Sequence, residues 1–315
     1  MDTVLLTKEI QPQMKAILEG KYELYDMTGY EKVADIPGLD PATVRACVTK
    51  GETIFGADLM SQLPALEVIS NYGVGYDGID VAEAIRRGVT VTNTPNVLTD
   101  DTANMSLLLT LAVTRRLVEL HEHVRDGEWE TAEGEILATS IVGKVCGVVG
   151  LGRIGGAVAE RLAACGAKVA YSDPIKQDVP YDYYADAASL AAASDVLVVS
   201  CFGGAGTFHL VNAEVLDALG PQGFLVNAAR GSIVDEAALV SALKDGKIAG
   251  AGLDVFEDEP RVPAELRSMP NVVLTPHQGS GTHETRRRMA EVCHSNIEAF
   301  FAGKPVVTPV PEHSK

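Results

Sequence analysis

Three residues with acid, base or anion-binding chemistry follow apolar runs in the second half of the chain. Arg230 follows "GFLVNAA", Glu259 lies just beyond "IAGAGLDVF", and His277 comes two residues after "NVVLT". Such runs predict buried strands, and ligands of open parallel sheets bind beyond the carboxyl ends of the strands. The sequence therefore predicts that a guanidinium, a carboxylate and an imidazole meet at one sheet edge.

These three groups could together bind a 2-keto acid and transfer a proton. Arg230 can bind both the carboxylate and the carbonyl oxygen through charge-assisted hydrogen bonds. His277 can donate a proton to that oxygen as hydride arrives, and Glu259 on the other ring nitrogen would stabilise imidazolium. Each residue alone has a plainer interpretation: a surface ion pair, a polar histidine, or part of the solvated run "EDE". Asp235 is predicted only to cap a helix.

A glycine pattern upstream predicts a dinucleotide site. Gly150, Gly152 and Gly155 form a GxGxxG motif between a predicted strand and helix, and Asp173 ends the next predicted strand. The glycines permit a tight turn, close approach of a pyrophosphate and close helix packing, while N–H groups at the helix start bind the anion. Asp173 can accept hydrogen bonds from the adenosine ribose hydroxyls and would repel a 2′-phosphate. We therefore expect NAD rather than NADP, with nearby Lys176 leaving NADP as the alternative.

Composition limits the class of protein. The chain has 315 residues, of which 46% are hydrophobic, and a formal net charge of −17, which suggests two domains and disfavours nucleic-acid and membrane partners. The start of the chain lacks the pattern of a signal peptide, and "TANMSLLLTLAVT" is too short to span a bilayer. The scattered cysteines predict free thiols in a reducing cytoplasm and no metal site. They are Cys47, Cys146, Cys165, Cys201 and Cys293.

The order of apolar runs predicts an α/β fold with parallel sheets covered on both faces. Strands are expected at 3–7, 45–49, 66–71 and 89–93, and in a second series at 144–150, 167–173, 195–201, 223–229, 248–256 and 271–275. Between the two series, residues 100–126 predict one helix of about 25 residues, which is long for a globular protein. Because residues 105–113 are apolar on nearly every side, we expect this helix to lie between two domains and also to bury against a second copy in a homodimer.

At these residues the chain resembles the D-isomer-specific 2-hydroxyacid dehydrogenase family over nearly its whole length. The matching pieces include "NYGVGYDGIDV", "VTNTPNVLTDDTAN", "GVVGLGRIGGAVAERL", "LVNAARGSIVDEAALVSAL", "AGLDVFEDEP" and "LTPHQGSGT". Within the family it is most similar to the glyoxylate/hydroxypyruvate reductase branch. The resemblance implies a discontinuous, flavodoxin-like substrate domain of residues 1–97 and 284–315. It also implies a Rossmann NAD-binding domain of residues 98–283.

The resemblance also implies roles for single residues. Arg230, Glu259 and His277 would be the catalytic set, which agrees with the interpretation from the residues themselves. Val74 and Gly75 would bind the substrate carboxylate through backbone N–H groups, and Lys50 would reach the substrate. Beyond the glycines and Asp173, the residues that would line the cofactor are Thr102, Arg153, Ile154, Cys201, Ala228 and Asp254. Three positions depart from the family pattern: Gln278, Phe202 and Asn104.

Other functions remain open at this point. Phosphoglycerate and phosphite dehydrogenases can share the same three catalytic residues, whereas formate dehydrogenases have Gln at the position of Glu259. A protein of a different class, one that binds NAD(H) as a sensor without catalysis, can also keep this fold. Turnover of 2-keto acids would distinguish these classes.

Overall fold

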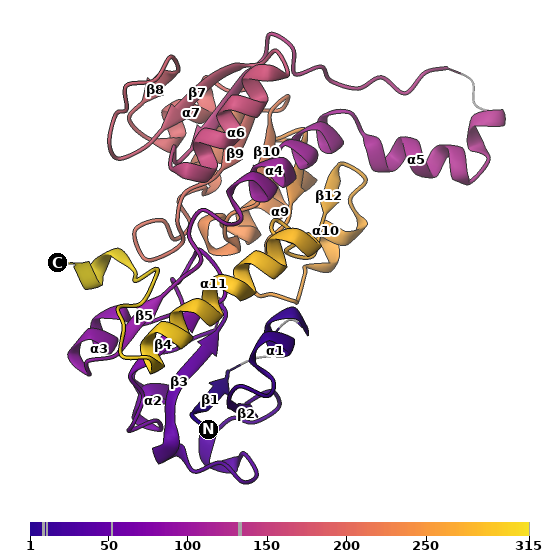
Figure 1. The fold of residues 1–315 in the computed structure, drawn as a ribbon. Coiled ribbons are helices and arrows are strands. Elements are labelled where there is room, and N and C mark those ends of the chain that lie inside the picture. The colour runs from indigo at the N-terminus through magenta and orange to yellow at the C-terminus, as the bar shows by residue number, and fades with distance from the viewer. Residues whose placement is uncertain (8–9, 11, 52, 132–133, 315) are drawn as a thin grey trace. The chain divides into compact units, whose positions relative to one another are not determined.

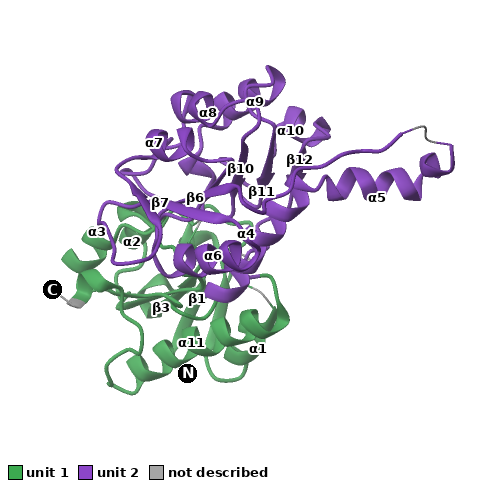
Figure 2. Ribbon diagram, turned by 90° about the horizontal axis from the view of Figure 1, so that it is seen from above, with its two compact units in different colours: residues 1–98, 281–315 green, residues 99–280 purple. Residues whose placement is uncertain are grey.

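The chain folds into two compact α/β units in the computed structural model, which describes residues 1–7, 10, 12–51, 53–131 and 134–314. Unit 1 comprises Met1–Leu98 and Gly281–Lys315, and unit 2 comprises Thr99–Ser280 (Figure 2). Every strand pair in both sheets is parallel. The predicted two-domain α/β class is therefore confirmed. The substrate-binding role predicted for the first domain stays a prediction.

The sheet of unit 1 has the strand order β2-β1-β3-β4-β5, which is the flavodoxin-like order. Its strands are β1 (Thr3–Leu6), β2 (Glu23–Asp26), β3 (Val44–Thr49), β4 (Val68–Asn71) and β5 (Thr90–Thr92). The runs that predicted strands here are largely buried, whereas β2 lies at the sheet edge and is partly exposed. Edge strands bury only part of their surface, which explains why no continuous apolar run marks β2 in the sequence.

Helices cover both faces of this sheet. They are α1 (Pro12–Leu18), α2 (Ala57–Ser61), α3 (Val81–Arg86) and α11 (His283–Phe301). Helices α1 and α11 contact each other, and Cys293 of α11 accepts a hydrogen bond from Ser70 of β4 at its backbone oxygen. On the opposite face, Met60 of α2 and Ala84 of α3 pack in one cluster with Ile69 of β4. The C-terminal helix is therefore part of the first unit's core.

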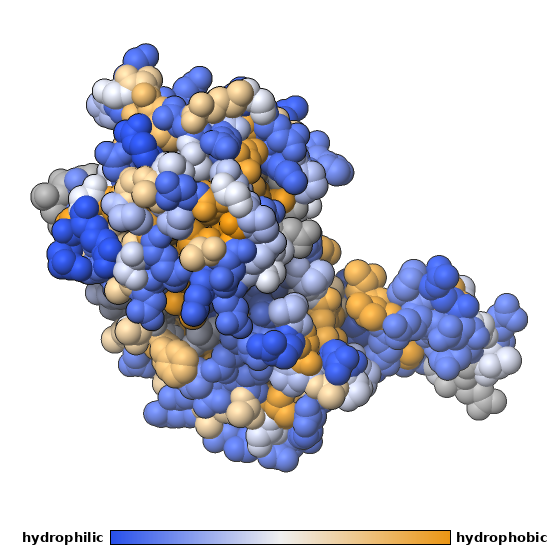
Figure 3. Space-filling view, turned by 90° about the horizontal axis from the view of Figure 1, so that it is seen from below, coloured by the Kyte–Doolittle hydropathy of each residue, from blue (hydrophilic) through white to orange (hydrophobic). Residues whose placement is uncertain are grey.

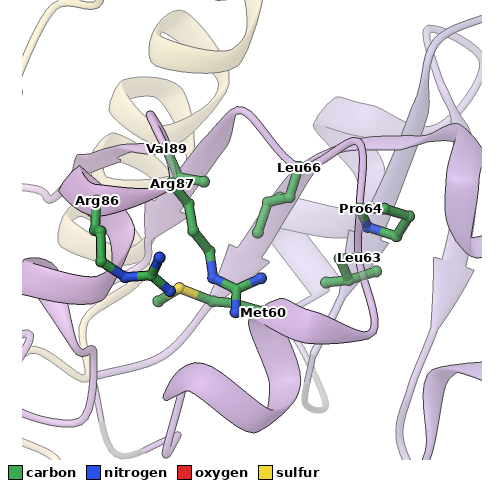
Figure 4. Close-up of a pocket in the computed structure, with 7 residues that line it drawn as sticks. All are labelled: Met60, Leu63, Pro64, Leu66, Arg86, Arg87 and Val89. Atoms are coloured by element: carbon green, nitrogen blue, oxygen red, sulfur yellow. The ribbon is translucent and has the colours of Figure 1, made fainter.

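A hollow of about 400 Å³ lies in unit 1, and it is lined by Met60, Leu63, Pro64, Leu66, Arg86, Arg87 and Val89. Figure 4 shows apolar side chains and two guanidinium groups around this space. Arg86 and Arg87 both bind the carboxylate of Glu83, at 2.6 Å each. Because one carboxylate of the chain already binds both cations, we assign no ligand to this hollow.

Unit 2 contains a seven-stranded sheet with the order β12-β11-β10-β9-β6-β7-β8, which is the order of a doubly wound dinucleotide-binding sheet. Its strands are β6 (Val145–Val149), β7 (Lys168–Ser172), β8 (Asp182–Tyr184), β9 (Val196–Val199), β10 (Phe224–Asn227), β11 (Gly250–Leu253) and β12 (Val272–Leu274). The strand order reverses between β6 and β9, where ligands of such sheets bind.

Alternate residues along these strands lie on opposite faces of the sheet and pack in two separate hydrophobic cores. Val148 packs with helices α4 (Thr99–Thr114) and α6 (Arg153–Ala164). Val149 packs on the other face with α7 (Ala187–Ala192), α8 (Ala213–Leu219) and α9 (Glu236–Lys244). Because side chains alternate across a strand, both faces of the sheet are buried, as the continuous apolar runs predicted. Asp235 caps α9 by accepting a hydrogen bond from Ala238 N at 2.9 Å, as expected.

The prediction of one continuous helix over residues 100–126 is wrong. The segment forms α4 and then α5 (Leu117–Arg125), separated at Arg116, whose backbone is left-handed with φ 53°. A non-glycine residue in this conformation costs about 1–2 kcal/mol. The Arg116 guanidinium forms two hydrogen bonds to Glu119 and one to the Leu137 carbonyl, which stabilise the break.

Helix α5 extends away from the rest of unit 2 as an arm (Figure 1). Apolar side chains gather at the start of this arm in Figure 3. Large apolar side chains that are exposed on α4, α5 and the segment after α5 are Leu108, Leu117, Val118, Val124, Trp129 and Leu137. Among the described residues, no helix is long and apolar enough to cross a membrane.

Candidate active site

His277 and Glu259 form a hydrogen-bonded pair beyond the carboxyl ends of β12 and β11. His277 Nδ1 lies 2.7 Å from Glu259 Oε2, and the two side chains are 28% and 24% exposed. The second oxygen of Glu259 accepts a hydrogen bond from Phe256 N at 3.0 Å, which fixes the carboxylate. Because Nδ1 binds Glu259, we expect Nε2 to be the ring nitrogen that exchanges a proton with a substrate.

The backbone at His277 is left-handed, with φ 52°, and hydrogen bonds hold it there. His277 N donates to the carbonyl oxygen of Asp254 at 2.8 Å. The buried Asp254 carboxylate accepts three further hydrogen bonds, from Thr275 Oγ1 at 2.6 Å and from Gln278 N and Gly279 N at 2.7 Å each. An uncommon backbone conformation persists when its surroundings determine it this strongly. Hydrogen bonds to Asp254 therefore hold the loop that carries His277 in place.

Arg230 reaches the same region because the glycine after it allows a close backbone approach. A Cβ atom at Gly231 would overlap the carbonyl group of Phe256, so only glycine lets the loop after β10 lie against the segment that leads to Glu259. Asn227 shapes the turn by donating to Arg230 O at 2.8 Å and accepting from Ala229 N at 3.0 Å. The structure thus brings the Arg230 loop beside the segment that carries Glu259.

The electrostatics of the site favour the ionised form of Glu259. Burial by itself would raise the pKa of Glu259, but the hydrogen bond and charge of His277, the Phe256 N–H and the charge of Arg230 hold this pKa below its usual value. Asp254 differs, because burial raises its pKa despite the hydrogen bonds that it accepts. Glu259 is therefore suited to stay ionised and stabilise a protonated imidazole.

The glycine turn after β6 has the geometry that a pyrophosphate needs. Gly150 has φ 88°, and a Cβ atom there would lie 2.6 Å from Cys201 Cα. A Cβ atom at Gly155 would overlap Gly150 O, whereas the space beside Gly152 is open and Gly152 caps the start of α6. Two of these glycines permit close packing and the third leaves room for a ligand at the helix N-terminus. The residues present fit a dinucleotide.

Asp173 follows β7 and lies next to this turn. Its carboxylate accepts hydrogen bonds from Leu151 N at 2.9 Å and from Ile175 N at 3.1 Å. Each carboxylate oxygen can accept more than one hydrogen bond, so capacity remains for ribose hydroxyls. Lys176 Nζ instead lies over the ring of Tyr183, 5.7 Å from its centroid.

The other predicted cofactor residues also belong to unit 2, and whether they touch a cofactor stays a prediction. Arg153 and Ile154 are the first residues of α6. Thr102 of α4 is buried near the Asp254 loop, because a Cβ atom at Gly279 would lie 3.5 Å from its methyl group. Cys201 lies two residues beyond the end of β9, and Ala228 directly follows β10.

The predicted substrate residues lie in unit 1, at the carboxyl edge of its own sheet. Lys50 directly follows β3, and Val74 and Gly75 lie in the loop after the neighbouring β4. Their contact with a substrate stays a prediction. Sequence reasoning assigned Asp254 a cofactor role only through resemblance and missed its three hydrogen bonds to the histidine loop. The Thr275 hydroxyl in "LTPHQG", two residues before His277, was the available signal.

All five cysteines are free thiols, as predicted. Within the part of the chain that the structure describes, no cluster of histidine, cysteine or carboxylate side chains could hold a metal ion.

The sequence and the structure match known proteins closely. A family model described as "D-isomer specific 2-hydroxyacid dehydrogenase, NAD binding domain" matches residues 107–279. Hydroxyphenylpyruvate reductase of Plectranthus scutellarioides is 44% identical over 308 residues, 98% of each chain. Glyoxylate/hydroxypyruvate reductase A of Arabidopsis thaliana is 48% identical over 269 residues, 85% of this chain and 86% of that one.

A solved structure is also similar. The NADPH-dependent glyoxylate/hydroxypyruvate reductase of Sinorhizobium meliloti, in complex with NADP and malonate, superposes with a TM-score of 0.93 at 40% identity. The match covers 98% of this chain and 97% of that one.

Proposed function

Because the chain belongs to the D-isomer-specific 2-hydroxyacid dehydrogenase family, we propose that it reduces glyoxylate, hydroxypyruvate or a similar small 2-keto acid to the D-2-hydroxy acid. It is an oxidoreductase that interconverts 2-keto and 2-hydroxy acids with a nicotinamide cofactor. The observation that carries the proposed roles is the 2.7 Å contact between His277 and Glu259 beyond the strand ends of unit 2.

We propose the following division of labour among the residues. A bound nicotinamide would supply hydride to the carbonyl carbon. The Arg230 guanidinium binds the substrate's carboxylate and carbonyl oxygen, which orients and polarises the C=O bond. His277 donates a proton from Nε2 to that oxygen, while ionised Glu259 stabilises the imidazolium form beforehand. In the oxidative direction, neutral His277 accepts the proton from the hydroxyl group.

Three further substrate contacts are those that the family resemblance implies. We propose that the N–H groups of Val74 and Gly75 bind the substrate carboxylate, and that Lys50 adds positive charge. A chain with a net charge of −17 needs such local donors, because its overall field repels anions.

We propose NAD as the preferred cofactor. The support is Asp173, a carboxylate placed beside the glycine turn, which would repel a 2′-phosphate. The similar Sinorhizobium enzyme is NADPH-dependent by name, and the ratio of kcat/KM with NADH to that with NADPH tests the preference proposed here.

We also propose a homodimer formed through α4 and the arm, because exposed apolar side chains gather there. A cytoplasmic location is proposed because all five thiols are free.

The experiment that tests the function follows NADH and NADPH oxidation with glyoxylate, hydroxypyruvate, pyruvate and hydroxyphenylpyruvate. We expect turnover with at least one small 2-keto acid. Arg230→Ala should weaken binding of the transition state by several kcal/mol, which lowers kcat/KM on the order of a thousandfold. Arg261→Ala is the control, because this arginine is 77% exposed and pairs with Asp258. No turnover with any acid, or an Arg230→Ala variant as active as the control, would refute the proposal.

A further inference from the structure

Three consecutive carbonyl groups in the loop after β4 each accept a side-chain hydrogen bond. Asn71 Nδ2 donates to Gly73 O at 3.0 Å and to Gly75 O at 2.9 Å. Asn93 Nδ2, from the segment after β5, donates to Val74 O at 2.8 Å. All of these residues belong to unit 1. Two asparagine side chains therefore bind three successive carbonyl oxygens of this loop, and Gly73 O also accepts from Thr94 N at 3.0 Å.

This arrangement also sets the direction of the N–H groups. In a planar trans peptide the N–H points opposite to the C=O of the same peptide unit. Fixing the carbonyls of Gly73 and Val74 therefore fixes the N–H groups of Val74 and Gly75 on the other side of the loop. Neither N–H donates a hydrogen bond to a described residue. Successive N–H groups held in this way form an anion-binding concavity.

We propose that Asn71 and Asn93 are positioning residues, which orient the Val74 and Gly75 N–H groups toward the substrate carboxylate. This inference rests on the proposed function, because it assumes that this loop binds the acid. The two asparagines act through the loop and need no contact with the substrate themselves.

The burial of Asn71 supports a role beyond packing. Its side chain is fully buried, and its Oδ1 has no hydrogen-bond partner among the described residues. Only the amide nitrogen can donate to carbonyls, so the two bonds to the loop determine how the side chain is turned. A buried acceptor without a partner destabilises a fold, and an apolar residue at this position would avoid that cost. The side-chain amide of Asn71 therefore stabilises the conformation of the loop after β4.

Asn93 is held by the C-terminal segment. Its backbone N donates to Thr308 O at 3.2 Å, and Thr308 Oγ1 donates to Asn93 O at 2.6 Å. The side chain of Asn296 in α11 binds Thr308 twice. Asn296 Oδ1 accepts from Thr308 N at 2.9 Å, and Asn296 Nδ2 donates to Thr308 Oγ1 at 2.8 Å. The C-terminal segment thus fixes the backbone from which Asn93 reaches the loop.

The test is Asn93→Asp, which keeps the shape of the side chain and replaces the donor with an ionisable oxygen. At pH 8 the introduced carboxylate repels Val74 O, and the KM for glyoxylate should rise about tenfold, while kcat and the Kd of NADH change less than about twofold. At lower pH the introduced carboxyl group becomes a donor again. The ratio of the variant's KM to that of wild type should then fall toward one, a recovery that mere loss of packing would not give.

A control separates this effect from a general loss of stability. Asp40 caps the 3₁₀ turn Pro41–Thr43 before β3 by accepting from Ala42 N at 3.0 Å. That turn lies at the amino edge of the sheet, opposite the loop after β4. Asp40→Ala should therefore lower stability and leave the KM for glyoxylate unchanged.

Two results would overturn the inference while leaving the proposed function intact: an unchanged KM in Asn93→Asp, or a rise in KM that does not recover at low pH. If Asn93→Asp does not fold, Asn93→Ser, which adds no charge, should raise KM about fivefold to tenfold, and an unchanged KM would again overturn it.

If wild type reduces no 2-keto acid, the proposed function fails separately. Calorimetric titration with oxalate then tests the inference. Weaker oxalate binding by Asn93→Asp than by wild type supports it. Equal binding by the two proteins, or no binding by wild type, overturns it.

Discussion

Glu259→Gln tests the electrostatic core of the proposed site. The amide keeps the side chain's shape and an oxygen that can accept a hydrogen bond from His277 Nδ1, but it removes the negative charge. Two unit charges about 4 Å apart interact by about 4 kcal/mol at an effective dielectric constant of about 20. Both side chains are about a quarter exposed and a neutral hydrogen bond remains, so we expect a loss of about 2 kcal/mol. This corresponds to roughly a thirtyfold lower kcat/KM for reduction.

The assay is the initial rate of NADH oxidation with glyoxylate from pH 5 to pH 9. The His277 hydrogen bond and charge lower the pKa of Glu259, so ionised Glu259 must in turn favour the protonated imidazole. Without that charge the imidazole loses its proton at lower pH. The fall of the reduction rate with rising pH should therefore begin on the order of one pH unit lower in the variant.

Glu257→Gln provides the matched control, because Glu257 is another glutamate of the same acidic run and binds His209 at 2.9 Å instead of His277. We expect it to keep near-native activity and an unchanged pH profile. If Glu259→Gln showed the same kcat/KM and the same pH profile as this control, the assignment of Glu259 to the proton relay would be wrong.

Three further predictions concern cofactor choice, pH-dependent stability and assembly. Asp173→Ser should raise the ratio of kcat/KM with NADPH to that with NADH at least about tenfold, or about 1.4 kcal/mol, and an unchanged ratio would remove Asp173 as the selecting group. Burial lowers the pKa of His313, whose Nε2 accepts from Val91 N at 2.9 Å. The folded state thus favours neutral His313. As pH falls below 6.5, the free energy of unfolding should therefore decrease more in wild type than in His313→Gln. Equal pH dependence of the two proteins in urea titrations would contradict this. Leu117→Glu combined with Val124→Glu should convert a dimer into a 33.3 kDa monomer in sedimentation velocity, whereas an unchanged mass would place the interface elsewhere.

The sequence predicted the strands of unit 2 well because both faces of that sheet are buried. Each run from "KVCGVVG" to "NVVLT" contains a strand in the structure. Strands β2 and β8 were missed, because both lie at sheet edges and their partly exposed residues give no continuous apolar run. The break at Arg116 was missed for a related reason. The helical pattern continues on both sides, and one long-range hydrogen bond from the Arg116 side chain to the Leu137 carbonyl helps to stabilise the turn.

The candidate site could be predicted in part. Glu259 and His277 each follow a recognisable strand, and the parallel topology makes their meeting foreseeable. The role of Asp254 in the histidine loop could not be derived, because it depends on side-chain directions within a few ångströms. The same holds for Asn71 and Asn93, which bind neighbouring carbonyl groups of one loop because β4 pairs with β5.

The most direct test of the central claim is a crystal structure with NADH and oxamate, an unreactive analogue of a 2-keto acid. We predict that His277 Nε2 and the Arg230 guanidinium both lie within about 3.2 Å of the oxamate carbonyl oxygen, with Glu259 still bound to His277 Nδ1. A complex in which neither side chain contacts that oxygen would contradict the account.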